Sequence, residues 1–233
     1  MQSYSEYALC IQRVFRGYRV RKSPIGKYVR ICTTLQKLNK LVKFKATKND
    51  GRIDSAIDEN RVVDAIKTLF KPSQIRLTSA KSRCWYDIMI GDIPINIKIT
   101  SGRASDNIFC KKGVFYTLCG TIYNEYALNY NDWFQKILEH GIVRERTRNL
   151  EYHFLVLFKN SGRVMFKSIL DIQCLCVNPT NILQVNWNTE SSCKKLIRAN
   201  SKTELLQKVQ FALRLSLLNS ATFTDADLSN LFI

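Results

Sequence analysis

The sequence predicts an α/β protein in which helices flank a mixed β-sheet, and three observations lead to this fold class. Residues 85–100 form two short apolar strands around a Gly-Asp pair. A second pair of strands is expected on either side of residues 160–162. Apolar residues at helical spacing precede and follow these hairpins. The 233 residues include 45% hydrophobic residues and only 9 Gly and 4 Pro, which suits one sizeable folded domain.

The first fifty residues are expected to form a basic helical arm. They hold twelve of the 36 Lys and Arg residues, against only Glu6 and Asp50. Apolar residues recur there at helical spacing, and a second helical stretch over 28–43 continues the pattern. The turn signal Asn-Asp-Gly at 49–51 predicts the boundary between an arm over 1–50 and a core domain over 51–233.

A helix is expected directly before the first hairpin. Pro72 ends a helical pattern of apolar residues formed by Ile57, Val62, Val63, Ile66, Leu69 and Phe70.

The register of the first hairpin follows from a two-residue turn at 91–92. Glycine at the first central position suits the positive φ of such a turn. Positions 88–90 then pair in reverse order with 93–95. This register places Pro94 opposite Met89 in a non-hydrogen-bonded pair, where no partner needs the missing N–H.

The same register predicts one polar and one apolar face. Asp87 falls opposite Asn96, and Lys98 lies on their face because side chains alternate along a strand. The other face carries Ile95, Ile97 and Ile99.

This polar face resembles the core of the PD-(D/E)xK nucleases, in which an acid and an acid-x-Lys triplet hold Mg²⁺ and activate water. The resemblance covers Asp87 and the triplet Asn96-Ile97-Lys98, with Tyr86 in the place of the family's proline and Asn96 in the place of its second acid. It implies that Asp87, Asn96 and the carbonyl of Ile97 bind Mg²⁺. It implies that Lys98 orients or deprotonates water.

A helix before the hairpin often supplies a glutamate to such sites, and this makes Glu59 a further catalytic and metal-binding candidate. The alternative is that Glu59 is a surface acid or an acid of the helix's first turn, stabilised by the helix dipole. Asp106 is a less favoured substitute for the missing carboxylate.

The segment after Lys98 is expected to form a helix that Ser105 or Asp106 caps and Gly120 ends. Its apolar residues are expected to lie on the apolar face of the hairpin. Residues 106–107 and 113–120 resemble the segment that follows the catalytic Lys in some type II restriction endonucleases.

The remaining chain predicts a helix over 132–139 closed by Gly141, and a hairpin of 152–159 with 163–168. Residues 178–187 are predicted to form a turn followed by a strand, and they too resemble a segment of those enzymes. Ser201 or Thr203 is expected to cap a final amphipathic helix that ends near 218.

The formal net charge of +17 and the pI near 9.7 favour a polyanionic partner, most simply nucleic acid. The alternative is a basic protein without such a partner. Candidate DNA contacts are Ser101, Arg103, Asn107, Lys111, Lys112, Arg144, Arg146, Arg148, Lys194 and Lys195.

The 8 cysteines form no CxxC pair and only two histidines are present, which argues against a zinc site of usual spacing. They are expected to be reduced core thiols of an intracellular protein, in the cytoplasm or nucleus of a host cell. No signal peptide and no long apolar run indicates secretion or a membrane span.

Residues 11–21 match the IQ motif of calmodulin-binding helices at Ile11, Gln12, Arg16, Gly17 and Arg21. A calmodulin-like protein is therefore one candidate partner of a basic amphipathic helix. The alternative is that this helix lies along DNA phosphates, a virion surface or a partner subunit. The motif suggests a eukaryotic or eukaryotic-virus setting.

Together these features predict a restriction-endonuclease-like core with a basic helical arm. The expected activity is Mg²⁺-dependent, site-specific cleavage of double-stranded DNA, and the resemblance implies a homodimer. One alternative is a catalytically inactive DNA-binding protein on the same scaffold, with Asn96 as the sign of lost catalysis. Another is a calmodulin-regulated adaptor.

Overall fold

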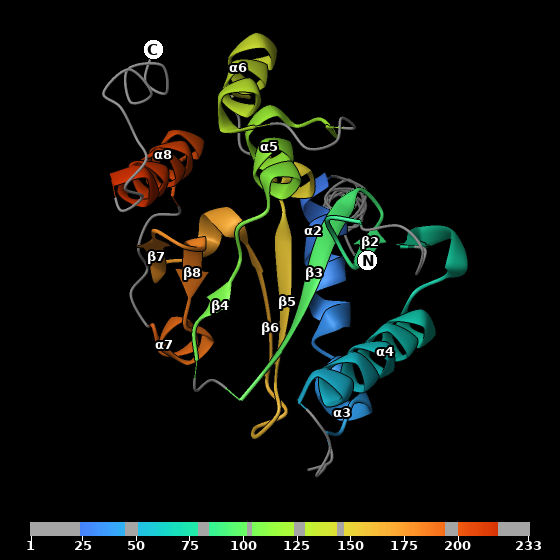
Figure 1. Cartoon of the computed structure of the whole chain (residues 1–233). Helices are drawn as coiled ribbons and strands as arrows, with labels where there is room; N and C mark the ends of the chain where they lie inside the picture. The colour runs from blue at the N-terminus through green and yellow to red at the C-terminus, as the bar shows by residue number, and fades with distance from the viewer. Residues whose placement is uncertain are drawn as a thin grey trace, which may run out of the picture.

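The computed structural model describes residues 24–44, 51–78, 84–101, 104–123, 129–143, 147–193 and 200–218. Its centre is a five-stranded mixed sheet in the order β1-β2-β3-β5-β6 (Figure 1). These strands are β1 (Ile75–Leu77), β2 (Ile88–Ile90), β3 (Ile93–Thr100), β5 (His153–Phe158) and β6 (Val164–Ser168). Helices cover both faces, so the predicted α/β class with a mixed, helix-flanked sheet is confirmed.

The register predicted for the first hairpin is confirmed. Ile90 pairs with Ile93 and Met89 with Pro94, while Gly91 takes a φ of 61°. The ladder stops at Ile88, however, so the expected strand pair of Asp87 with Asn96 is absent. The chain bends over 85–87, and there the Asp87 N–H donates to Ile95 O at 3.0 Å.

The isoleucine face of the sheet is covered by three helices. They are α2 (Pro24–Leu35), α3 (Leu38–Leu41) and α4 (Gly51–Leu69). The apolar cluster joins Ile95 and Ile97 of β3 to Val62 and Ile66 of α4, and Leu35 and Leu38 of the first two helices also belong to it. The helix expected before Pro72 is confirmed as α4, and the helical stretch expected over 28–43 is divided between α2 and α3.

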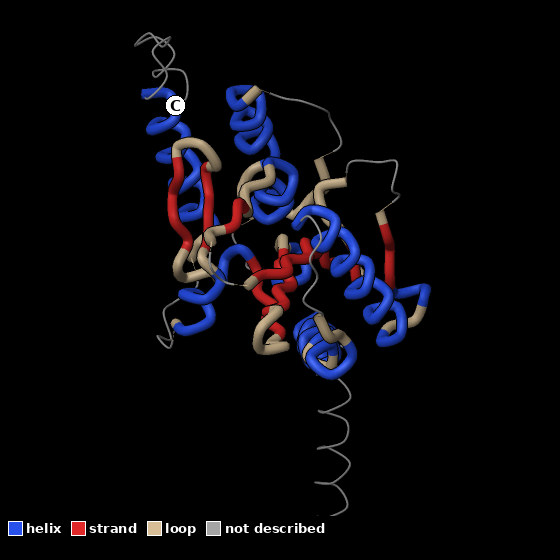
Figure 2. The backbone as a smooth tube through the Cα atoms, turned by 60° about the horizontal axis from the view of Figure 1, so that its bottom comes forward, coloured by secondary structure: helices blue, strands red, loops and turns tan. Residues whose placement is uncertain are grey.

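The other face of the sheet packs against α5 (Lys111–Cys119), α6 (Tyr130–His140) and a second sheet. This three-stranded sheet has the order β4-β8-β7, formed by β4 (Asp106–Asn107), β8 (Ile182–Val185) and β7 (Leu175–Asn178). Helix α8 (Lys202–Leu218) contacts β7 and β8, and Figure 2 shows this unit to one side of the central sheet.

Two expectations for the segment after β3 are wrong. Asp106 does not cap a helix, because its backbone pairs with Val185 in β4, and α5 begins at Lys111 after Cys110. The helix also packs on the face opposite the one expected, with Val114, Phe115 and Leu118 in the second apolar cluster. Because α2, α3 and α4 occupy the isoleucine face, the crossover helix between the parallel strands β3 and β5 lies on the other.

Most predicted helix ends are confirmed. Gly120 and Gly141 end α5 and α6 with positive φ values of 71° and 72°. Ser201 and Glu204 form a capping box at the start of α8, which decides between Ser201 and Thr203. The second hairpin, β5 with β6, is present as expected and widens the sheet. A short helix, α7 (Trp187–Ser192), follows β8.

The cysteines of the described residues are all free thiols. Cys119 is buried, but Cys84 and Cys176 are exposed, so the prediction of core thiols holds only in part. No helix in the described part of the chain is both long and apolar enough to span a membrane.

Candidate active site

Three carboxyl groups, each from a different element, lie within electrostatic range of Lys98, although none of them is within ion-pair distance of its ammonium group. Glu59 lies on α4, Asp87 precedes β2, and Asp106 lies on β4. In Figure 1, α4 and β4 flank the strand β3 that carries Lys98. Burial raises the pKa of all three acids, and the positive charge of Lys98 partly offsets this in each case.

The strand β3 places Lys98 because its side chains alternate between two faces. Its isoleucines belong to the cluster with α4, so Asn96 and Lys98 point to the opposite face. There they lie beside Phe154 and Val156 of β5, their partners in the parallel register. The isoleucines and the polar residues of β3 therefore lie on opposite faces as predicted. The second face is not polar as a whole, because Phe154 and Val156 belong to the apolar cluster that packs against α5.

Asp87 is held by the backbone of β3. Its Oδ2 accepts a hydrogen bond from Ile97 N at 2.6 Å. Burial raises the pKa of Asp87, while this hydrogen bond and the charge of Lys98 lower it. Because the N–H and C=O of one strand residue point to the same side, the Ile97 carbonyl faces the edge where Asp87 lies. Asp87 and the Ile97 backbone, both predicted site groups, are therefore adjacent.

Glu59 reaches this group from the helix layer. It lies in the third turn of α4 and is half-buried, so it is not an acid of the first turn. Burial raises its pKa, the charge of Asp87 raises it further, and Lys98 lowers it. The helix before the hairpin thus brings a glutamate to Asp87 and Lys98, as the sequence suggested.

Asp106 joins the site through a long-range strand pairing. The bridge of β4 to β8 fixes it within electrostatic range of Lys98 and near the indole of Trp187. Burial raises the pKa of Asp106, while Lys98 and the Trp187 N–H lower it. Trp187 Nε1 is buried and, among the described residues, reaches no partner in full hydrogen-bond geometry. Nothing local in the sequence marks this position as a strand.

The carboxylate, amide and carbonyl oxygens of the site are of the ligand types that a hard divalent cation prefers. Three carboxyl groups share one Lys, so negative charge is incompletely compensated. Asn96 Oδ1 is buried and has no hydrogen-bond partner among the described residues, which is costly for a polar atom. The donor set is nevertheless sparse: the described part of the chain holds no three His, Cys, Asp or Glu side chains close enough together for a metal ion. An amide and a backbone carbonyl would have to complete the coordination.

Aromatic residues that the sequence analysis missed support the bend carrying Asp87. Trp85 packs against Tyr86, Tyr116 and Tyr152. The Tyr152 hydroxyl donates to Trp85 O at 3.2 Å. A Cβ at Gly113 would lie 2.6 Å from the Tyr152 ring, so only glycine allows this approach of α5. The spacing of these residues in the chain gives no sign of their contact.

The predicted DNA contacts do not form one group. Ser101 and Asn107 are exposed, and Asn107 Oδ1 accepts a hydrogen bond from Phe109 N at 2.9 Å. Lys111 Nζ lies 3.9 Å from the centre of the Tyr130 ring, and burial lowers the pKa of Lys111. Lys112 follows it at the start of α5.

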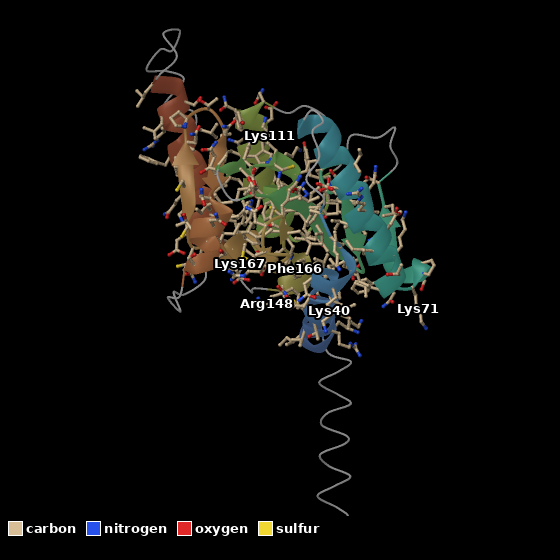
Figure 3. The ribbon with its side chains drawn as sticks, turned by 90° about the horizontal axis from the view of Figure 1, so that it is seen from below. Lys40, Lys71, Lys111, Arg148, Phe166 and Lys167 are labelled. Atoms are coloured by element: carbon tan, nitrogen blue, oxygen red, sulfur yellow. The ribbon has the colours of Figure 1, made fainter. Side chains whose placement is uncertain are left out.

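Arg148 lies on the opposite side of the molecule from Lys111 (Figure 3). Its Nη1 donates to Asp171 Oδ2 at 3.0 Å, and its guanidinium stands over the Tyr28 ring. The other predicted positions fall outside the described residues: Arg103, Arg144, Arg146, Lys194, Lys195 and the IQ-like segment 11–21.

No protein-family model, curated protein or solved structure matches this chain.

Proposed function

We propose that this protein is a Mg²⁺-dependent endonuclease that cuts double-stranded DNA in the manner of type II restriction enzymes with the PD-(D/E)xK core. One observation carries the proposal: Asp87 Oδ2 accepts a hydrogen bond from Ile97 N at 2.6 Å on the strand that carries Lys98, and Glu59 of α4 lies within electrostatic range of both. An ordinary exposed hairpin face would not gather a buried acid, a lysine and a helix glutamate.

Each residue has a role in phosphodiester hydrolysis. Asp87 and Glu59 would hold the cation with carboxylate oxygens, and Asn96 Oδ1 and the Ile97 carbonyl would add neutral oxygens. Bound there, Mg²⁺ would lower the pKa of a water molecule and offset charge on the phosphate. Lys98 orients the attacking water or accepts its proton, and its charge favours the scissile phosphate.

The charge of the whole chain supports a DNA substrate. A net charge of +17 favours a polyanion through phosphate neutralisation and counterion release, which makes binding sensitive to salt. A symmetric DNA site is matched most simply by a two-fold dimer, so a homodimer is part of the proposal.

The experiment is to incubate the protein with plasmid DNA in Mg²⁺ or in EDTA. We expect discrete fragments with the wild type in Mg²⁺ only, and at least about a 100-fold loss of cleavage in Lys98→Ala and Asp87→Ala. Cleavage that survives in both variants would contradict the proposal, and so would absence of cleavage with every divalent metal.

A second candidate keeps the DNA binding and lacks the catalysis. The sparse donor set and the amide of Asn96 in place of an acid favour it. It predicts gel shifts of DNA that weaken with salt and no cutting under any metal. The plasmid experiment separates the two candidates directly.

A further inference from the structure

A second concave site lies at the other end of the central sheet. It is a pocket of about 570 Å³ between α2, the end of α4 and the turn of the first hairpin. Gly91 lies on its wall, seven residues before Lys98 along an extended strand, so the pocket and the Lys98 site are roughly 20 Å apart. A volume of this size suits a small organic ligand.

The wall on α2 is cationic. Lys27 and Arg30 line the pocket one turn apart, and both side chains are exposed. Among the described residues neither has a carboxylate within ion-pair distance, whereas Lys67 and Lys136 on other helices pair with acids at 2.7 and 2.9 Å. Residues 24–44 contain no Asp or Glu, so no acid of this segment competes for these charges.

The floor of the pocket is apolar, and its rim offers hydrogen bonds. Leu69, Phe70 and Ile90 line the floor, and Thr34 and Gln74 stand at the rim. Gln74 Oε1 accepts the hydrogen bond of Lys71 N, which leaves the amide NH₂ group as a donor. The pocket therefore combines two cations, an apolar surface and a few polar groups.

We propose that this pocket binds a nucleotide, with its phosphate on Lys27 and Arg30 and its base against the apolar floor. A free nucleoside monophosphate and an unpaired or terminal nucleotide of a nucleic-acid strand share this chemistry. The exposed Lys37, Lys40 and Lys43 continue the positive charge along the chain beyond α2 and would follow a strand's phosphates. Figure 3 shows Lys40 and Lys71 on the side away from Lys111.

The test is binding of 5′-dAMP by calorimetry and of a labelled single-stranded 12-mer by fluorescence anisotropy. We expect Lys27→Ala/Arg30→Ala to weaken dAMP binding at least about tenfold, since two charge-assisted contacts are lost. The matched control Lys136→Ala/Lys208→Ala removes the same charge from α6 and α8, which do not line the pocket, and should bind as the wild type does. Thr34→Trp, which fills the pocket and keeps both cations, should also abolish dAMP binding.

Comparing the two binding measurements distinguishes a free nucleotide from a nucleotide of a nucleic-acid strand. Tighter binding of the 12-mer than of dAMP, weakened by the same double variant, assigns the pocket to a strand, and equal or weaker binding assigns it to a free nucleotide. The proposal is overturned if the double variant and its control behave alike, or if Thr34→Trp binds dAMP normally. It is also overturned if Lys98→Ala alone abolishes binding, or if anionic lipid vesicles bind while dAMP does not.

Discussion

Two neighbouring acids on α4 have opposite surroundings. Asp58 is buried and forms ion pairs with Lys159 at 2.7 Å and Arg61 at 3.2 Å. Glu59 is half-buried, lies near the like charge of Asp87, and has a raised pKa that Lys98 only partly offsets. One acid is compensated by the fold, and the next is left with excess negative charge at a candidate site.

Glu190 repeats the first pattern in another part of the molecule. It is almost wholly buried, pairs with Lys167, and accepts hydrogen bonds from Gln173 N and Cys174 N at 3.0 and 2.8 Å. Buried charges of this kind are matched within the protein because desolvation is costly. Carboxylates whose negative charge is only partly balanced within the protein, such as those near Lys98, are typical of catalytic and ligand-binding sites.

The largest expected effect is on stability, and it comes from removing a buried carboxylate whose charge is balanced within the protein. Glu190→Ala should lower the free energy of unfolding by about 3–5 kcal/mol, because Lys167 and two backbone N–H groups lose their partner. Glu59→Ala, the matched control at the candidate site, should cost less than about 1 kcal/mol. Urea denaturation of the two variants measures both values, and equal losses would remove the distinction.

The next effect separates the neighbouring acids of α4. Glu59→Gln should lower cleavage by about 100-fold and leave stability unchanged or higher, since a carboxyl group with a raised pKa destabilises the fold once it is ionised. Asp58→Asn should do the reverse, losing stability while it retains cleavage. Paired cleavage and denaturation assays measure this, and a variant that lost both properties together would argue against separate roles.

A smaller effect comes from a buried group that stays neutral. His153 donates from Nδ1 to Glu151 O at 2.8 Å, its ring stacks on Phe166, and its Nε2 has no partner among the described residues. Burial lowers the pKa of His153 to about 4. The unfolded chain, with a histidine pKa near 6.5, therefore binds more protons between those values.

The contribution of neutral His153 to the free energy of unfolding should thus be fully present above about pH 6.5. It should decline by about 2–3 kcal/mol as the pH falls towards 4. Unfolding free energies measured across this range give the slope. His153→Phe keeps an aromatic ring beside Phe166 and should flatten the slope, whatever its effect on absolute stability. An unchanged slope in this variant would show that other groups cause the decline.

The elements predicted well from the sequence are those fixed by local rules. A Gly-led two-residue turn sets the register of the first hairpin by counting, and Pro72 limits α4. Glycines with positive φ end α5 and α6. The resemblance to the nucleases also suggested Glu59, and the structure brings this residue within electrostatic range of Asp87 and Lys98.

What the sequence did not predict depends on contacts far apart in the chain. The pairing of Asp106 with Val185 spans nearly eighty residues and involves a strand of two residues, too short for any periodicity. The face chosen by α5 depended on which face α4 already covered. The contact of Tyr152 with Trp85 has the same long-range origin.

The most direct test of the central claim is Mn²⁺ binding measured by calorimetry on the wild type, Asn96→Asp and Asp87→Asn. If the carboxylates near Lys98 form a cation-binding site, the wild type should bind Mn²⁺, and Asp87→Asn should lose that binding. Asn96→Asp should bind at least about tenfold more tightly, because it adds a charged ligand where a neutral oxygen is buried without a partner. No binding by the wild type, or equal affinity in all three proteins, would contradict the account.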